Sequence, residues 1–264
     1  MRVLVTGAAS GIGRATCLKI AADAQAKNHP AHIAAVDLQI GDALRSLGAE
    51  LESVGAEAQL IAGDMGTADQ PAQVVTQAVE AFGGLDGVVS NAGINRTGPL
   101  LDYAVEDWDA MFAVNTRATW LLAKAAHDTL AANAGAIVAT SSMSGHFAHA
   151  GLGPYGPSKA AVSMLIKVLA QEFGRDGIRC NSVCPGMVQT GMTRTVYENA
   201  EIAQQRAELV PLGRVAQPED LARVIAFLLG PEAAYINGQD IIVDGGMTGN
   251  LLGRIPGINE ITRS

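Results

Sequence analysis

Cysteine, aromatic residues and clustered positive charge are all scarce in this sequence. The three cysteines, Cys17, Cys180 and Cys184, are odd in number and lie in apolar runs, which favours reduced, buried thiols in a cytoplasmic protein. Cys180 and Cys184 have no partner pair at zinc spacing, so we expect no metal site. The net charge is −8 and no Lys/Arg cluster occurs, which argues against a nucleic-acid partner.

Long hydrophobic runs are missing as well. No apolar run approaches the length of a membrane span, and the opening "MRVLVTG" is a strand entering a turn, too short for a signal peptide. We therefore expect neither a membrane partner nor secretion. A chain of 264 residues with 48% hydrophobic residues and 30 glycines is ample for a buried core.

What the sequence does contain is a regular alternation of apolar runs and helical stretches. The runs are continuously apolar, as expected of parallel strands buried on both faces. The expected strands are 2–6, 32–37, 58–64, 85–93, 136–142, 178–186 and 238–246, and the expected helices are 11–26, 41–55, 69–82, 106–132, 155–174 and 217–229. This order predicts an α/β fold, a doubly wound parallel sheet of about seven strands flanked by helices on both faces. Without a linker or repeat, residues 1–264 form one domain.

A glycine-rich turn follows the first expected strand. "VTGAASGIG" (5–13) places Gly7, Gly11 and Gly13 between strand and helix. Glycine permits a tight turn, close approach of a pyrophosphate to the backbone, and close helix packing. The first N–H groups of the helix then face the phosphates. The alternative is an ordinary turn between strand and helix, but its place after the first strand favours dinucleotide binding.

Asp37 ends the second expected strand, 24 residues after Gly13. A carboxylate there accepts hydrogen bonds from both adenosine ribose hydroxyls and repels a 2′-phosphate. No Arg or Lys occupies residues 8–10 or directly follows Asp37. We therefore expect NAD rather than NADP. The alternative role, a helix cap at a strand end, fits less well because Asp37 closes an apolar strand.

Tyr155 and Lys159 are four residues apart, which puts them on one face of a helix. A free phenol has a pKa of about 10, too high for a base at neutral pH. A nearby ammonium and an oxidised nicotinamide ring both favour the phenolate. The alternative is that the pair is only the first exposed turn of a surface helix. Because proline is tolerated in a first turn, Pro157 predicts that the helix begins at about Tyr155.

These residues and further motifs resemble the short-chain dehydrogenase/reductase family from residue 3 to about 246. "SNAG" (90–93) matches the family's "NNAG", with Ser90 in place of an Asn that stabilises a strand. Asp64 matches the adenine-contacting position, and "PGMVQT" (185–190) and "VDGG" match two later motifs. The resemblance implies a Rossmann-type fold. The implied cofactor-binding residues are Gly7, Ser10, Gly11, Ile12, Gly13, Asp37, Leu38, Asp64, Met65, Asn91, Ala92, Gly93, Tyr155, Lys159, Pro185, Gly186, Val188 and Thr190.

The resemblance also implies four catalytic residues, Asn115, Ser142, Tyr155 and Lys159. Hydride passes between a carbinol carbon and the nicotinamide while Tyr155 takes or donates the hydroxyl proton. Ser142, thirteen residues before Tyr155, orients the reacting oxygen. Lys159 binds the nicotinamide ribose and lowers the pKa of Tyr155, and Asn115 holds a water of a proton relay.

The substrate is expected beyond the carboxyl ends of the strands, under a helical lid at about 190–211. Substrate-binding candidates are Arg96, Ser142, His146, His149, Tyr155, Met187 and Asn199. The cationic side chains suggest a sugar, polyol or hydroxy acid. Alternatively, Arg96 is a solvated loop residue and the histidines face water.

Two other functions stay open. One is a reductase of 3-oxoacyl thioesters or of hydrophobic ketones such as steroids, and the other is a non-catalytic dinucleotide-binding protein. The resemblance further implies a homodimer or homotetramer formed through the helices at 106–132 and 155–174. The tail at 247–264 either crosses a subunit interface or is a frayed terminus.

Overall fold

Seven parallel strands form one sheet in the computed structural model, which describes residues 1–250 and 253. The strands are β1 (Arg2–Thr6), β2 (His32–Asp37), β3 (Glu57–Ala62), β4 (Gly87–Ser90), β5 (Ala136–Thr140), β6 (Arg179–Pro185) and β7 (Asp240–Val243). Their order across the sheet is β3-β2-β1-β4-β5-β6-β7, and every neighbouring pair is parallel. The predicted doubly wound parallel sheet is confirmed.

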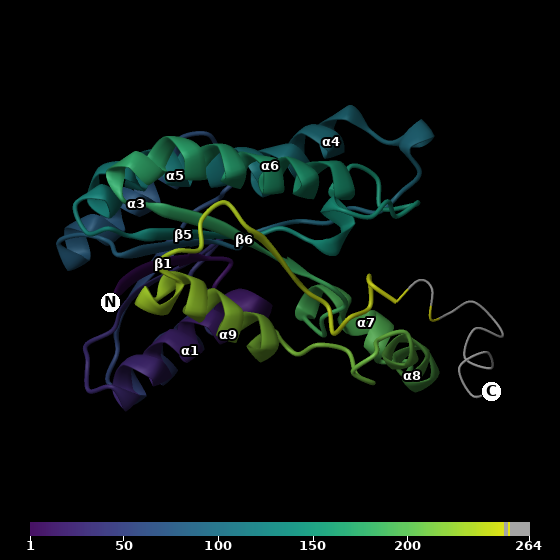
Figure 1. Cartoon of the computed structure of the whole chain (residues 1–264), viewed down its shortest axis with the longest axis horizontal. Helices are drawn as coiled ribbons and strands as arrows, with labels where there is room; N and C mark the ends of the chain where they lie inside the picture. The colour runs from purple at the N-terminus through teal and green to yellow at the C-terminus, as the bar shows by residue number, and fades with distance from the viewer. Residues whose placement is uncertain (251–252, 254–264) are drawn as a thin grey trace.

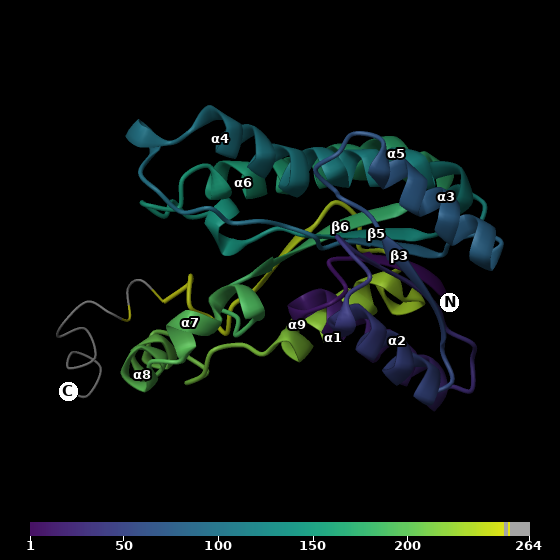
Figure 2. The ribbon, with the colours of Figure 1, turned by 180° about the vertical axis from the view of Figure 1, so that it is seen from behind.

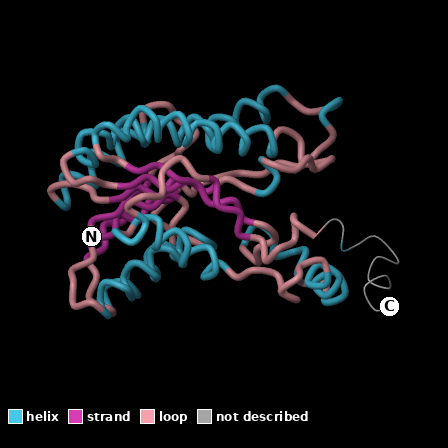
Figure 3. Tube along the Cα trace, viewed as in Figure 1, coloured by secondary structure: helices cyan, strands magenta, loops and turns pink. Residues whose placement is uncertain are grey.

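Helices cover both faces of this sheet (Figures 1 and 2). On one face lie α1 (Gly11–Ala26), α2 (Asp42–Ser53) and α9 (Pro218–Leu229), and on the other lie α3 (Gln70–Phe82), α4 (Val105–Phe112), α5 (Ala118–Ala131) and α6 (Tyr155–Phe173). Two short helices, α7 (Arg194–Tyr197) and α8 (Ala200–Glu208), lie beyond the carboxyl end of β6. Figure 3 shows the strands as a single layer between two helical layers.

The core is divided into two halves by the sheet. In β1, Val3 and Val5 face the cluster shared with α1, α2 and α9, whereas Leu4 faces the cluster shared with α3, α5 and α6. All three side chains are fully buried. Because burying one such side chain stabilises the fold by about 1.5–3 kcal/mol, an apolar residue is favoured at every strand position, and not only at alternate ones.

The strand order reverses between β1 and β4, which are neighbours in the sheet. The chain winds from β1 towards β3 on one side and from β4 towards β7 on the other. Connections on either side therefore leave a crevice at the carboxyl ends of β1 and β4, where open α/β sheets bind ligands.

The predicted helix at 106–132 is not uniform. It consists of α4, a π-helical turn at Ala113–Arg117 and α5. The observed strands β4 and β7 are shorter than the strands predicted at 85–93 and 238–246. The predicted lid at 190–211 contains α7 and α8, preceded by a 3-10 turn at Gly191–Thr193.

Among the residues that the structure describes, no helix is both long and apolar enough to span a bilayer. Of the predicted tail at 247–264, residues 251–252 and 254–264 lie outside the described part.

Candidate active site

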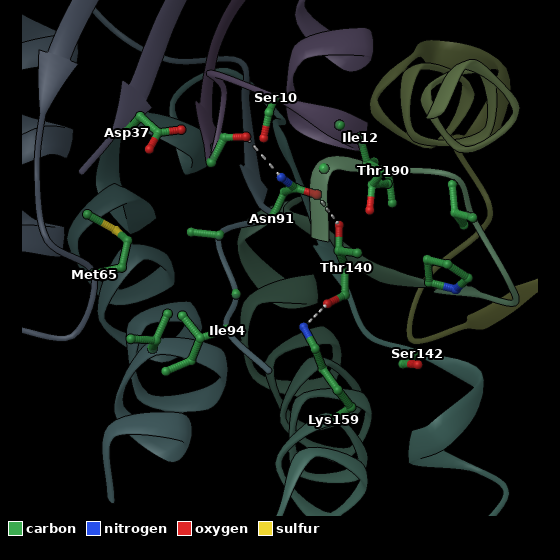
Figure 4. Close-up of a pocket in the computed structure, with 18 of the residues that line it drawn as sticks. Ser10, Ile12, Asp37, Met65, Asn91, Ile94, Thr140, Ser142, Lys159 and Thr190 are labelled. Atoms are coloured by element: carbon green, nitrogen blue, oxygen red, sulfur yellow. Dashed lines mark hydrogen bonds between the residues drawn. The ribbon is translucent and has the colours of Figure 1, made fainter. Parts of the chain in front are cut away.

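A cleft of about 460 Å³ opens at the carboxyl ends of the strands. Figure 4 shows side chains from both halves of the sheet converging on it. All the predicted cofactor-binding residues except Gly13 line this cleft, as do Ser142, Tyr155 and Lys159. The cleft thus unites positions spread from the glycine turn to Thr190.

The glycine turn meets its neighbours closely enough to exclude larger residues. A Cβ atom on Gly13 would lie 2.2 Å from the carbonyl oxygen of Gly7, so any side chain would push α1 away from β1. Gly7 itself has a φ of +67°, in the left-handed region that glycine tolerates. Gly13 therefore acts through packing, which explains why it does not line the cleft.

Asp37 lies at the end of β2 with its carboxylate held by two backbone amides. The Ala9 N–H donates to Oδ2 and the Leu38 N–H donates to Oδ1, each at 2.8 Å. These bonds fix the carboxylate beside the glycine turn, at the edge of the cleft. A fixed anion there favours hydroxyl donors and opposes a second negative charge.

Asn91 joins the two halves of the sheet at the switch point. Its Nδ2 donates to the Thr6 carbonyl at 3.0 Å, and its Oδ1 accepts from the Thr140 hydroxyl at 3.1 Å. The Thr6 hydroxyl accepts from the backbone N–H groups of Asn91 and Ala92, both at 3.0 Å. The ends of β1, β4 and β5 are thereby tied together under the cleft (Figure 4).

Tyr155 and Lys159 come from the first turns of α6, which begins at Tyr155 as predicted. The Lys159 ammonium donates to the Thr140 carbonyl at 2.8 Å and lies 5.8 Å from the centre of the Tyr155 ring. Ser142 follows β5, where its hydroxyl accepts from the Ser144 N–H at 3.1 Å and also hydrogen-bonds Tyr155. The pair opens a helix and also lines the cleft, and the buried Lys159 does not fit the alternative of an exposed surface turn.

Burial controls the protonation of both side chains. It lowers the pKa of Lys159 to about 8, since only 4% of this residue is exposed. Burial also raises the pKa of Tyr155, although the hydrogen bond with Ser142 acts in the opposite direction. Both causes of this shift, burial and the Ser142 hydroxyl, are separate from Lys159, so the expectation that Lys159 lowers the pKa of Tyr155 stays a prediction.

Asn115 occupies the π-helical turn between α4 and α5 and is almost fully buried. Its Nδ2 donates to the Ile94 carbonyl and to the Ser158 hydroxyl, each at 3.0 Å, and its Oδ1 accepts from the Ile94 N–H at 2.9 Å. Ser158 in turn donates to the Tyr155 carbonyl at 2.7 Å. Asn115 thus supports the start of α6 from behind the cleft, and does not line it.

Five of the predicted substrate-binding residues do not line the cleft: Arg96, His146, His149, Met187 and Asn199. The Arg96 guanidinium pairs with the Asp107 carboxylate, and His149 lies in an exposed loop. Asn199 caps α8, with its Oδ1 accepting from the Glu201 and Ile202 N–H groups at 3.0 and 3.2 Å. His146 lies against Cys184, with 3.4 Å between Nε2 and Sγ.

Met187 is likewise absent from the lining, although its neighbours Gly186 and Val188 belong to it. The substrate role of these five residues stays a prediction.

Some of the lining and its support lie outside the predicted site residues, although Gly191 and Thr193 fall within the predicted lid at 190–211. Additional lining residues are Val36, Gly63, Ile94, Val114, Thr140, Ser141, Gly191 and Thr193. Thr140 acts on Lys159 through its carbonyl, a group that every residue type has, so no residue signal could mark it. Ser158 could have been found, because it lies between Tyr155 and Lys159 on the same helical turn.

Comparison with known proteins identifies the family of this chain. A family model described as enoyl-(acyl carrier protein) reductase matches residues 7–248. An L-rhamnose 1-dehydrogenase (NAD(P)(+)) of Sphingomonas sp. (strain SKA58) is 37% identical over 251 residues, which cover 94% of this chain and 96% of the relative. The chain belongs to the short-chain dehydrogenase/reductase family.

A second curated relative and a solved structure are also similar to this chain. A (3R)-3-hydroxyacyl-CoA dehydrogenase of Mus musculus is 37% identical over 253 residues, covering 92% of this chain and 95% of the relative. A short chain dehydrogenase from Burkholderia cenocepacia J2315, solved in complex with NADP, has a TM-score of 0.85 and 34% identity. That likeness covers 94% of this chain and 97% of the solved one. The protein is therefore an oxidoreductase of this family.

Proposed function

We propose that this short-chain dehydrogenase/reductase transfers hydride between NAD(H) and a secondary alcohol or ketone, with a polar hydroxy compound as substrate. The observation that carries the proposal is the convergence of Ser142, Tyr155 and Lys159 with Asp37 in a single cleft. Its volume of about 460 Å³ falls in the range of small-molecule sites, roughly 300–1,000 Å³.

The residues of the cleft fit a dinucleotide. Gly13 leaves the space that a Cβ atom would fill, which lets α1 start close to the turn, with N–H groups available for phosphate. The Asp37 carboxylate, held by two amides, suits a ribose diol. NAD is preferred for the same reason, since a 2′-phosphate would meet this carboxylate. The bound nicotinamide supplies the hydride acceptor or donor.

The protein's own groups handle the proton and hold the reacting oxygen. Because burial favours the phenol, Tyr155 holds the proton that a ketone oxygen receives on reduction. The Ser142 hydroxyl hydrogen-bonds the same oxygen and orients it. In oxidation Tyr155 takes the proton back, and the nearby Lys159 ammonium stabilises the phenolate. Asn115 supports this site by fixing Ser158 and the Ile94 backbone.

Two substrate classes are compatible with this chemistry. The rhamnose dehydrogenase supports a sugar or polyol, whereas the hydroxyacyl-CoA dehydrogenase supports a 3-hydroxyacyl thioester as the second candidate. Arg96 and His149 do not line the cleft, so the similarity to the rhamnose dehydrogenase is the observation that favours the first class.

An absorbance assay at the NADH band tests the proposal. We expect NADH formation with one or more sugars, polyols or hydroxy acids, at a higher kcat/KM with NAD than with NADP. Turnover restricted to 3-hydroxyacyl thioesters would select the second candidate, and absence of turnover with every alcohol would contradict both.

We also infer a cytoplasmic, homo-oligomeric enzyme. Cys17, Cys180 and Cys184 are free and buried, which suits a reducing compartment. Trp120 and Met164, on α5 and α6, are 45% and 60% exposed, which suits association through these helices.

A further inference from the structure

Behind the cleft, three potential metal ligands from distant parts of the chain converge. His146 follows Ser142 by four residues, Cys184 lies in β6, and Asp240 opens β7. One ligand atom of each side chain lies within 4.8 Å of those of the other two. Sequence spacing alone predicted no metal site at the cysteines, because the partners of Cys184 are brought to it only by the fold.

Two of the three ligand separations are close to those of a tetrahedral centre. His146 Nε2 lies 3.4 Å from Cys184 Sγ and 3.7 Å from Asp240 Oδ2. Zinc bonds of about 2.0–2.3 Å at tetrahedral angles put neighbouring ligand atoms roughly 3.4–3.6 Å apart. One nitrogen close to both a sulfur and a carboxylate oxygen is the arrangement of ligands around a shared cation.

The surroundings orient the ligands. The Asp240 side chain is only 6% exposed, and its Oδ1 accepts a hydrogen bond from the Ser182 hydroxyl. Ser182 and Cys184 are two residues apart in β6, so their side chains point to the same face of the sheet, towards α6. Such outer hydrogen bonds are typical supports of metal ligands.

A lysine of the chain now neutralises the carboxylate. The Lys167 ammonium lies 2.9 Å from Asp240 Oδ2, but its side chain is 45% exposed. It can therefore turn into solvent on its flexible stem when another cation takes its place. Access is provided by His146, whose side chain is 28% exposed.

We propose that His146, Cys184 and Asp240 form a binding site for a thiophilic divalent cation of the zinc type, in competition with Lys167. Imidazole, thiolate and carboxylate are the ligands that zinc takes, and three protein ligands leave a fourth position for water. Binding transfers the thiol proton of Cys184 to solvent. The cation would join the segment after Ser142 to β6 and β7, and so stabilise the folded enzyme.

Titration of the chelator-treated full chain with Co²⁺ and Zn²⁺ tests this site. We expect one cation per chain and a thiolate-to-cobalt charge-transfer band. Cys184→Ser should abolish the band and weaken binding by more than about 100-fold, since loss of outer supports alone weakens binding by roughly 10- to 100-fold. Lys167→Gln should bind several-fold more tightly, an effect that a purely structural cluster would not show.

Cys17→Ala provides the matched control, because Cys17 is buried in the core on the other face of the sheet. It should bind cobalt like the wild type. His146→Ala removes a ligand at the surface and serves as the second loss variant if Cys184→Ser does not fold. The proposal is overturned if binding is not saturable at one cation per chain, if the band persists in Cys184→Ser, or if Lys167→Gln binds no more tightly.

Discussion

We expect Asp37 to decide between the two nicotinamide cofactors. Its carboxylate offers two oxygens to hydroxyl donors, and a hydrogen bond to a charged group contributes about 1.5–3 kcal/mol. We expect Asp37→Ser to lower kcat/KM for NAD by about 10- to 100-fold and to raise it for NADP.

Steady-state kinetics with both cofactors measures this change. Asp42→Ser is the control, because Asp42 is exposed in the first turn of α2 and does not line the cleft. An unchanged NAD/NADP ratio in Asp37→Ser would reject the cofactor assignment.

The buried Lys159 ammonium destabilises the fold, although we expect it to be needed for turnover. Its pKa is about 8 in the fold, below the ordinary 10.5, so burial of the ammonium opposes folding. At about 1.36 kcal/mol per unit, Lys159→Met should raise the free energy of unfolding at pH 7 by up to about 3 kcal/mol while turnover is lost. The Thr140 carbonyl, left without its donor, reduces this gain.

The sign follows from proton linkage. Below pH 8 Lys159 is protonated in both the folded and the unfolded chain, so its buried charge destabilises the fold in full. Between about pH 8 and 10.5 the unfolded chain binds more protons than the folded one, so the stability of the wild type rises with pH. The advantage of Lys159→Met should therefore shrink over this range in denaturant titrations. Lys27→Met, at an exposed position, should show no such trend. A variant less stable than wild type at pH 7 would contradict this account.

At the scale of elements, two loops beside the cleft are joined by a small clamp. The Gly98 N–H donates to the Gly151 carbonyl at 2.9 Å, and the Tyr103 hydroxyl donates to the Arg96 carbonyl at 2.8 Å. Gly153, whose φ is +54°, lies against the Tyr103 ring, so that a Cβ atom there would approach a ring carbon to 2.4 Å. The clamp ends two residues before Tyr155.

We therefore expect Gly153→Ala to displace the segment leading into α6 and to lower kcat by at least about 10-fold, because small displacements of reacting groups reduce rates strongly. The NADH dissociation constant should remain near the wild-type value, since Gly153 does not line the cleft. Gly151→Ala is the control: its φ of +83° imposes similar backbone strain, but nothing lies within 4 Å of its Cβ position. Equal loss of kcat in both variants would show that backbone strain alone, and not the contact with the Tyr103 ring, is responsible.

Apolar runs and helical stretches predicted the existence and order of the elements, but not their ends. The run at 85–93 is longer than β4, because β4 pairs with β1 and β5 only over Gly87–Ser90. The π-helical turn had no signal either. It is fixed by Asn115 bonding to the backbone of Ile94, which is 21 residues away, and such a contact depends on the fold.

The site shows the same division. The sequence predicted the motif residues of the cleft because their side-chain types carry the chemistry. It did not predict that His146 lies beside Cys184 and Asp240, or that Arg96 pairs with Asp107. These last pairings join separate elements, so spacing along the chain does not reveal them.

At the scale of the whole molecule, the outer surface of α5 and α6 exposes several large apolar side chains outside the cleft. Trp120, Met164 and Val168 are 45%, 60% and 44% exposed. Trp120 and Leu165 also line a second hollow of about 490 Å³. Association through this surface would remove apolar area from water, at about 25 cal/mol per Å².

We therefore expect Met164→Asp combined with Val168→Asp to reduce the proposed oligomer to a smaller species. Light scattering measures the mass, and Ile202→Asp, at an exposed position of α8, is the control with one added charge. An unchanged mass in the double variant would exclude this surface as the interface.

The most direct test of the central claim compares turnover and cofactor binding in Tyr155→Phe. The substitution removes only the phenolic oxygen, which we assign to proton transfer between the protein and the reacting oxygen. We predict a loss of kcat of about 10²- to 10⁴-fold with an NADH dissociation constant near that of the wild type. Wild-type-like turnover in Tyr155→Phe would contradict the assignment of this cleft as the catalytic site.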